Sequence, residues 1–231
     1  MAYIQAITVS PTASATTTAA TLTGVGAGNT IVAIWAIDDN AGTPGTPSAA
    51  GGGGDGWAAI TNWSITDGTN LYAQRGFINR NVTGGNTTVT ITHGTCTTRW
   101  LTLFEVSEVP GAGAIGDHFA ASSQTQSPPP TGADGASSGN ATPVASPWLQ
   151  IGFCANWAGG TPVAGTGFTT RGQNWDFGGD FSEAESRTGT GTSATAATFA
   201  RGANGVHFTS QIVITQGAAA ASILRQMMMQ H

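Results

Sequence analysis

Lysine is absent from this chain of 231 residues, and charged residues of every kind make up only 8% of it. The seven arginines are scattered, so no concentrated positive face is available for nucleic-acid phosphates or anionic lipids. Long apolar runs are also missing, and none approaches the roughly 20 residues that cross a bilayer. The opening MAYIQAITVSP has neither a basic start nor an apolar core, so it does not predict a signal peptide. The sequence therefore predicts no nucleic-acid partner and no membrane partner.

Helix-forming runs of Glu, Lys, Leu and Gln are missing before residue 217. Thr, Val, Ile and aromatic residues instead recur between Gly-rich breaks, a composition typical of strands. We therefore predict an all-β protein, and β-sandwiches often reach this length as one domain. Cysteine occurs only at Cys96 and Cys154. Without an export signal, two half-buried free thiols are favoured over a disulfide.

The segment 86–110 carries the clearest strand pattern. Val89 and Ile91 alternate with threonines, as in a strand with one solvated face. Residues 93–96 are expected to turn the chain, and residues 100–106 are almost continuously apolar, like a strand covered on both sides. This segment predicts a hairpin that leads into a core strand.

Other strands follow from the same patterns. The run TIVAIWAI is apolar on both faces and predicts a central strand, while the weakly alternating YIQAITV predicts an edge strand. The strands expected outside the hairpin are residues 3–9, 16–22, 30–37, 57–65, 71–78, 148–157, 195–201 and 206–215.

Residues 122–147 are poor in apolar side chains and contain PPP and GADGASSGN, so we expect a long surface loop. The three or four strands expected after this loop are too few to close a sandwich alone. We therefore expect them to complete the sheets of the first part, giving one β-sandwich domain over residues 1–216.

The last 15 residues, 217–231, read GAAAASILRQMMMQH and break the strand pattern. Their composition favours a helix, and four apolar side chains fall on one helical stripe. So short a helix is marginal alone and forms best against a partner. The residues expected to dock are Ile223, Leu224, Met227 and Met228.

The small-residue pattern of the chain resembles a family of Gly/Thr-rich, jelly-roll-like β-sandwich proteins found in tailed-phage virions and in bacterial secreted proteins. The resemblance spans about residues 17–215. It implies a jelly-roll-like antiparallel β-sandwich, and accessory virion proteins or ligand-binding modules rather than enzymes. One position departs from the pattern, because Glu108 stands where the family usually has glycine. The segments that carry the resemblance are TLTGVGAGNTIVAIWAI, TGGNTTVTIT, LTLFEVSEVPG, SPWLQIGFCANW and HFTSQIVI.

No nucleophilic catalytic motif is present, since there is no G-x-S-x-G sequence and the four histidines stand apart. The loop GGGGDG lacks the Lys-Ser/Thr of a phosphate loop and a following helix. His93 with Cys96 could form half of a metal site, but no second pair follows at ligand spacing. A turn histidine and an inert thiol are the favoured interpretation, so we expect no catalytic residues, no metal and no cofactor.

Carboxylates offer two alternatives. Glu105 and Glu108 end the core strand, and four more acids lie in NWDFGGDFSEAES: Asp176, Asp180, Glu183 and Glu185. Such a pair could serve glycoside hydrolysis if it faced a cleft. Clustered oxygens there, or in residues 38–40, could also hold calcium. The favoured interpretation is that these acids solubilise a loop and cap strand ends.

Seven tryptophans are many for a chain with two tyrosines. Those expected in the core are Trp35, Trp100 and Trp148. Those bordering Gly-rich loops are Trp57, Trp63, Trp157 and Trp175. An exposed indole there could stack on a sugar ring or anchor a protein contact, although packing is the favoured role.

Together these observations predict a non-enzymatic structural protein of a tailed-phage particle, assembled in the host cytoplasm, most readily a capsid decoration protein or another surface accessory protein. Its expected partners are the major capsid protein or other virion proteins, and docking of the tail on a neighbouring subunit predicts a homo-oligomer. The alternative is a carbohydrate-binding module or adhesin of a tail or fibre, which uses the four loop tryptophans to bind a surface glycan.

Overall fold

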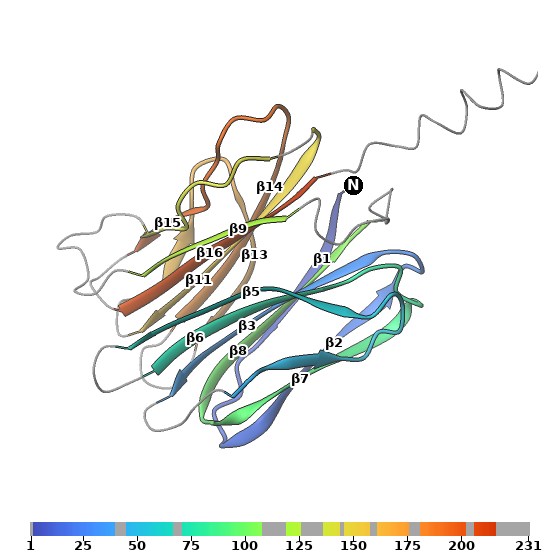
Figure 1. Cartoon of the computed structure of the whole chain (residues 1–231), viewed down its shortest axis with the longest axis vertical. Coiled ribbons are helices and arrows are strands. Elements are labelled where there is room, and N and C mark those ends of the chain that lie inside the picture. Colours follow the sequence, from blue (N-terminus) through green and yellow to red (C-terminus); the bar gives the residue numbers. More distant parts are fainter. Residues whose placement is uncertain are drawn as a thin grey trace, which may run out of the picture.

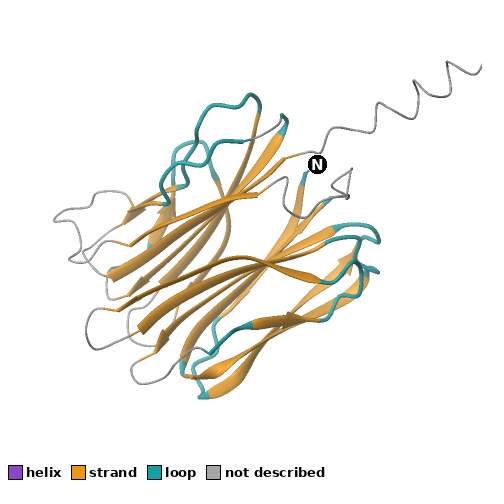
Figure 2. Ribbon diagram, in the orientation of Figure 1, coloured by secondary structure: helices purple, strands orange, loops and turns teal. Residues whose placement is uncertain are grey.

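The computed structural model of the chain describes residues 2–39, 45–66, 71–107, 119–125, 136–143, 146–157, 161–175, 181–201 and 206–215. This part of the chain forms 16 strands and contains no helix (Figure 2). The strands pair antiparallel, so the predicted all-β antiparallel sandwich is confirmed. Within these residues no helix is long and apolar enough to cross a membrane.

The strands divide into two consecutive groups of eight. The first eight are β1 (Tyr3–Val9), β2 (Ala15–Val25), β3 (Thr30–Asp39), β4 (Ser48–Ala50), β5 (Trp57–Thr66), β6 (Leu71–Asn79), β7 (Gly85–Cys96) and β8 (Thr98–Val106). The next eight are β9 (Phe119–Thr125), β10 (Ala136–Ser137), β11 (Trp148–Trp157), β12 (Pro162–Ala164), β13 (Thr169–Trp175), β14 (Phe181–Gly189), β15 (Thr198–Arg201) and β16 (Val206–Thr215).

Each group builds one large sheet and one small sheet. The first central sheet has the order β1-β8-β3-β6-β5, and the first cover is β2-β7-β4. The second central sheet has the order β13-β14-β11-β16-β9, and the second cover is β10-β15-β12. The two central sheets pack face to face with a cover on the outside of each, so the molecule is a stack of four layers (Figure 1).

The two groups of strands have the same topology. Adding eight to each strand number converts the first central sheet and its cover into the second central sheet and its cover. Even a β-bulge is repeated, at Ile60 in β5 and at Arg171 in β13. A faint trace remains in the sequence, where GTPSAAG around β4 matches GTPVAG around β12. The chain is therefore an internal duplication of an eight-stranded sandwich.

The halves are arranged about an approximate two-fold axis. Strand β1 contacts β13, and β5 contacts β9. In the second half, β13 is the counterpart of β5 and β9 is the counterpart of β1. Each contact therefore joins the same two kinds of edge strand, one from each half, as a two-fold axis requires. Thr8 of β1 closely approaches Gly172 of β13, at a point where a Cβ atom on the glycine would lie 2.6 Å from the threonine Oγ1.

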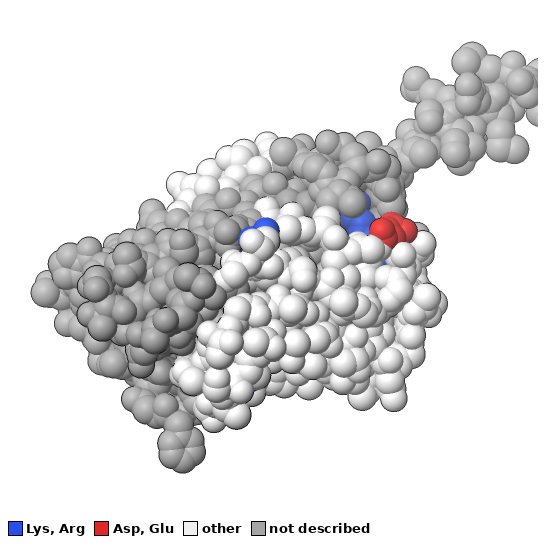
Figure 3. Space-filling model, turned by 60° about the horizontal axis from the view of Figure 1, so that its bottom comes forward, with Lys and Arg blue, Asp and Glu red and all other residues white. Residues whose placement is uncertain are grey.

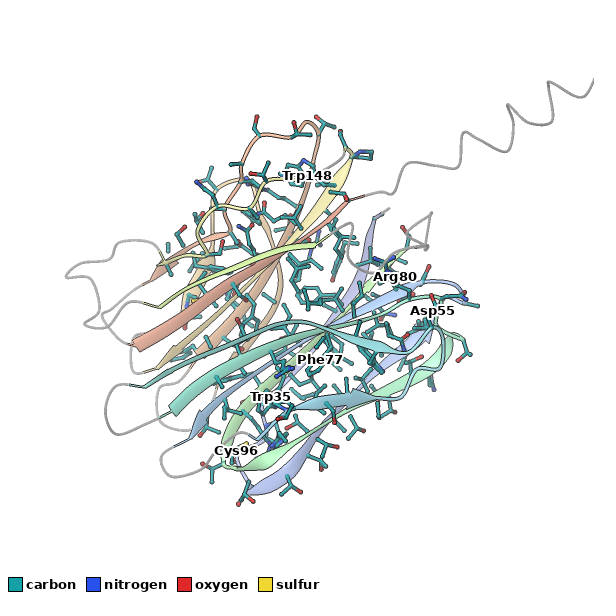
Figure 4. The ribbon with its side chains drawn as sticks, in the orientation of Figure 1. Trp35, Asp55, Phe77, Arg80, Cys96 and Trp148 are labelled. Atoms are coloured by element: carbon teal, nitrogen blue, oxygen red, sulfur yellow. The ribbon has the colours of Figure 1, made fainter. Side chains whose placement is uncertain are left out.

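Strand β3 shows why the layers stack. Val32 and Ile34 face the second central sheet, whereas Ile31 and Trp35 face the first cover. Trp35 and Phe77 of β6 lie in the core beneath that cover (Figure 4). The prediction of a central strand buried on both faces is confirmed. The prediction of core positions for three tryptophans is also confirmed, at Trp35, Trp100 and Trp148.

The predicted hairpin over residues 86–110 is wrong. Strand β7 continues to Cys96 and pairs with β2 and β4 in the first cover, while β8 belongs to the first central sheet. Val89 and Ile91 point from the cover into the core above that sheet. The chain therefore crosses at Thr97 from the first cover to the first central sheet. The crossing places the apolar faces of β7 and β8 against each other across the core between these two layers.

The second half also differs from expectation. Its strands form their own two sheets and do not complete the sheets of the first half. The expected loop 122–147 contains most of β9 and all of β10, and Ala136 and Ser138 are buried. These segments join sheets through backbone hydrogen bonds, which need no large apolar side chains. The predicted tail over residues 217–231 lies outside the described residues.

Candidate functional site

The residues expected to dock on a partner are not among those that the structure describes: Ile223, Leu224, Met227 and Met228. The four loop tryptophans fall in three strands. Trp57 and Trp63 belong to β5, Trp157 ends β11, and Trp175 ends β13. The first two are six positions apart along one strand, so they lie roughly 20 Å apart.

Trp57 is part of the packing beneath the first cover. It is partly buried against that core, and its Nε1 donates a hydrogen bond to the Gly51 carbonyl at 2.8 Å. The glycine-rich loop before it is held by Asn79, whose Nδ2 donates to the Gly53 carbonyl at 2.6 Å. Gly51 has φ +100° and no space for a Cβ, which would lie 2.1 Å from the Thr88 carbonyl oxygen. The loop is thus a close-packed support for Trp57.

Trp157 and Trp175 end strands β11 and β13 at the same end of the second central sheet. Trp175 pairs with Phe181 of β14, and Phe181 pairs with Asn156, which precedes Trp157. A single strand therefore separates the two positions. Of these two residues and of Trp63 the structure describes the backbone only.

Glu105 is buried at the end of β8 and ties three segments together. Its Oε1 accepts hydrogen bonds from the Gly26 amide at 2.8 Å and from Asn29 Nδ2 at 2.5 Å. Its Oε2 accepts from Gln5 Nε2 at 2.5 Å. The carboxylate thus fixes the β2–β3 turn against β1. Glu108, Asp176 and Asp180 lie outside the described residues.

Glu183 and Glu185 do not solubilise a loop, so that expectation is wrong. Both lie within β14, on the face toward the second cover, and both are fully buried. Burial raises the pKa of Glu183, which the side chains of Thr170 and Gln173 partly oppose. Burial also raises the pKa of Glu185 to about 8, although its Oε2 accepts a hydrogen bond from the Gly165 amide at 2.9 Å.

The two glutamates belong to a buried polar layer between the second central sheet and the second cover. Arg187 Nε donates to Gln150 Oε1 at 2.7 Å, and Gln211 hydrogen-bonds both to Gln150 and to the Gly139 carbonyl. Thr195 Oγ1 donates to the same Gln150 oxygen at 3.1 Å. Sequence reasoning missed this layer, because no local pattern separates a buried polar face from an exposed one.

This layer lacks the access that catalysis requires. A glycosidase needs two carboxyl groups that reach a bound sugar, whereas Glu183 and Glu185 are covered by the second cover. In the described part of the chain, no three His, Cys, Asp or Glu side chains are placed to hold a metal ion. The side chains of Asp38 and Asp39, another candidate for calcium, lie outside the described residues. The layer acts through packing and hydrogen bonding.

His93 and Cys96 do approach each other, with Sγ 3.3 Å from Nδ1. His93 Nε2 lies 2.9 Å from Thr18 Oγ1, and its Nδ1 lies 2.6 Å from the Gly94 carbonyl. Arg99 Nε donates to the same Thr18 oxygen at 2.9 Å. Burial lowers the pKa of His93, and the Arg99 charge adds to this. Neither cysteine forms a disulfide, and both are buried, in different sheets.

Comparison with known proteins returns no relative. No protein-family model matches the sequence, and no curated protein or solved structure resembles it at a significant level.

Proposed function

We propose that this protein is a non-enzymatic structural component of a tailed-phage virion, placed on the particle surface as a capsid decoration protein or a similar accessory protein. The observation that carries the proposal is the scarcity of charge outside the core. Of the few charged side chains described, Arg80, Arg99, Glu105, Glu183 and Glu185 are buried. The described atoms visible in Figure 3 are almost all uncharged.

An uncharged surface suits packing against a repeated protein shell. Stripping water from charged groups is costly, and the centres of protein interfaces are accordingly poor in charge. Apolar cores lie between the two central sheets and beneath the first cover, so large apolar side chains are withdrawn from the outer surface there. A homo-oligomer, or many copies on one shell, would repeat the same weakly charged contact.

Copy number tests the proposal. Mass spectrometry of density-purified particles from the source should give copies of this chain in simple proportion to the major capsid protein. A few copies per particle would move the protein to the tail or fibre. Its absence from purified particles would overturn the virion assignment.

The attachment segment can be tested separately. Removing residues 217–231 should abolish co-sedimentation of the purified protein with empty shells, while the far-ultraviolet circular dichroism stays that of a β protein. A variant with Ile223, Leu224, Met227 and Met228 changed to Ser keeps the length and should fail in the same way. Unchanged co-sedimentation of both variants would exclude the tail as the docking element.

The second candidate is glycan binding at the end of the second central sheet, where Trp157 and Trp175 end strands β11 and β13 at register positions on opposite faces. An array of bacterial surface polysaccharides should then show binding that Trp157→Ala or Trp175→Ala abolishes and that Trp57→Phe retains. Trp57 is the matched control because its indole belongs to the first half and packs inward. If no polysaccharide binds the unmodified chain, this candidate fails.

A further inference from the structure

A polar pocket of about 230 Å³ lies where the two halves meet. Tyr3 reaches it from β1 of the first half, and the remaining polar residues come from β13 and β14 of the second half. Pockets for drug-sized ligands usually exceed about 300 Å³, so this one suits a smaller group. Its polar lining residues are Tyr3, Thr169, Arg171, Ser186, Arg187 and Thr188.

Arg171 is held in a fixed orientation with most of its donors unused. Its guanidinium carbon lies 3.7 Å from the centre of the Tyr3 ring, a stacked cation–π arrangement. Its Nε donates to Ser186 Oγ at 2.8 Å. Within the described chain its two terminal nitrogens have no hydrogen-bond partner. They form the fork that recognises carboxylate and phosphate groups.

Arg187 also lines this pocket, but its side chain lies on the opposite face of β14 from Ser186, in the polar layer beneath the second cover. Its guanidinium carbon lies 4.2 Å from the centre of the Phe168 ring, and its Nε and Nη2 donate to Gln150 and Thr195. Its Nη1 has no hydrogen-bond partner among the described residues. The charge of Glu185 acts on Arg187, and burial raises the pKa of this glutamate to about 8.

No described carboxylate lies within ion-pair distance of either guanidinium. Arg171 has no counter-charge among the described residues, and its partial burial makes that lack more costly. An anion bound to its two terminal nitrogens would relieve this penalty. The hydroxyl groups of Thr169 and Thr188, which make no hydrogen bond within the described chain, could complete its coordination.

The fold itself does not require an arginine at this position. Ile60 occupies the matching bulge in β5, where it packs against the core between the central sheets. The second half has replaced this apolar contact with a guanidinium that stacks on Tyr3 of the first half. A charge that the architecture can dispense with indicates a role in binding.

We propose that this pocket binds a small oxyanion, a carboxylate or a phosphate group, held by the terminal nitrogens of Arg171. The group belongs to a ligand no larger than the pocket or protrudes from a larger one. This proposal does not depend on where the protein sits in a virion, because binding to the purified chain tests it alone.

Isothermal titration calorimetry of the full chain at low ionic strength tests the proposal with three probes: inorganic phosphate, glucuronate and neutral glucose. We expect saturable binding to one site for phosphate or glucuronate, and none for glucose. Binding of phosphate alone identifies a phosphate site, and binding of glucuronate alone identifies a carboxylate site. Absence of saturable binding for both anions would overturn the proposal.

Matched variants localise the site. Arg171→Gln should weaken binding by about tenfold to a hundredfold, as expected for the loss of charged hydrogen bonds. Arg171→Lys keeps the charge without the planar fork and should lose part of the affinity, which also guards against a folding defect in the first variant. Arg75→Gln, which removes a first-half arginine lying over Phe77, should bind like the unmodified chain. If Arg75→Gln and Arg171→Gln weakened anion binding equally, the binding would reflect the overall charge of the protein, which would contradict a site at Arg171.

Discussion

Phe77 and Glu185 occupy the same position in the two halves of the molecule. Each pairs with the residue directly before the β-bulge of the neighbouring edge strand, Phe77 with Ala59 and Glu185 with Thr170. Phe77 packs in the apolar core beneath the first cover, whereas Glu185 lies in the polar layer beneath the second. One architecture therefore accepts either a hydrophobic or a hydrogen-bonded interior at the same place.

Glu185→Gln should make the protein more stable at neutral and alkaline pH. The pKa of Glu185 is raised from 4.5 to about 8, so the folded state binds its proton more tightly than the unfolded state does. The contribution of this proton binding to the free energy of unfolding is complete below about pH 4.5 and is lost as the pH rises to about 8. The amide cannot ionise, and its oxygen can still accept the Gly165 hydrogen bond.

Urea unfolding across this pH range checks the prediction, with Glu105→Gln as the control. Glu105 accepts three hydrogen bonds, so an amide there would place a donor against donors and should cost roughly 1–3 kcal/mol. A Glu185→Gln variant whose stability falls with rising pH as steeply as that of the unmodified chain would contradict the assignment.

His93 should give the opposite pH dependence. Its pKa is lowered from 6.5 by burial, so the folded state favours the neutral ring that stacks on Trp35 at a centroid distance of 4.9 Å. Its contribution is complete above about pH 6.5 and is lost as the pH falls toward the lowered value. His93→Phe keeps a stacking ring but cannot titrate. The free energy of unfolding of this variant should change less than that of the unmodified chain as the medium is acidified below pH 6.5.

Gly51→Ala should destabilise the protein more than Gly56→Ala. Both glycines have positive φ, so alanine at either is strained by about 1–2 kcal/mol. At Gly56 the added Cβ meets open space, whereas at Gly51 it would lie 2.1 Å from the Thr88 carbonyl oxygen. The loop would have to leave the first cover and release Trp57. Thermal melts and tryptophan fluorescence of the two variants measure the difference, and equal melting temperatures would exclude the close contact.

The thiols of Cys96 and Cys154 should both be present and unreactive in the native protein. Neither forms a disulfide and both are buried, so a chromogenic thiol reagent can reach them only when the structure opens. Two thiols per chain should react at once in strong denaturant. Rapid reaction of either thiol without denaturant would contradict its position in the core.

The sequence was sufficient to predict the fold class and the strongest strands, because a run such as residues 30–37 can only be a strand covered on both faces. It was insufficient for β13 and β14. Gly172 interrupts the first, and Glu183 and Glu185 made the second resemble a solvated loop, although tertiary packing buries both acids.

The duplication escaped sequence reasoning for a related reason. Residues at matching positions of the two halves lie at the same place in their sheets but differ in chemistry. Phe77 corresponds to Glu185, and Ile60 corresponds to Arg171. The arginine pocket was equally hidden, since Tyr3 and Arg171 are brought together only by the contact between β1 and β13. The tryptophans in the core were recognisable because their strands are predominantly apolar.

The pairing of β1 with β8 sets an order for synthesis on the ribosome. The first strand cannot find its partner until residue 106 has been made, and such distant pairing slows folding. All partners of the first two sheets nevertheless lie before residue 107, so that sandwich can close while the second half is still being translated. The apolar face that packs against the second central sheet stays exposed to solvent until that sheet has formed. A nascent chain stalled halfway would expose this face and should be the species most prone to self-association.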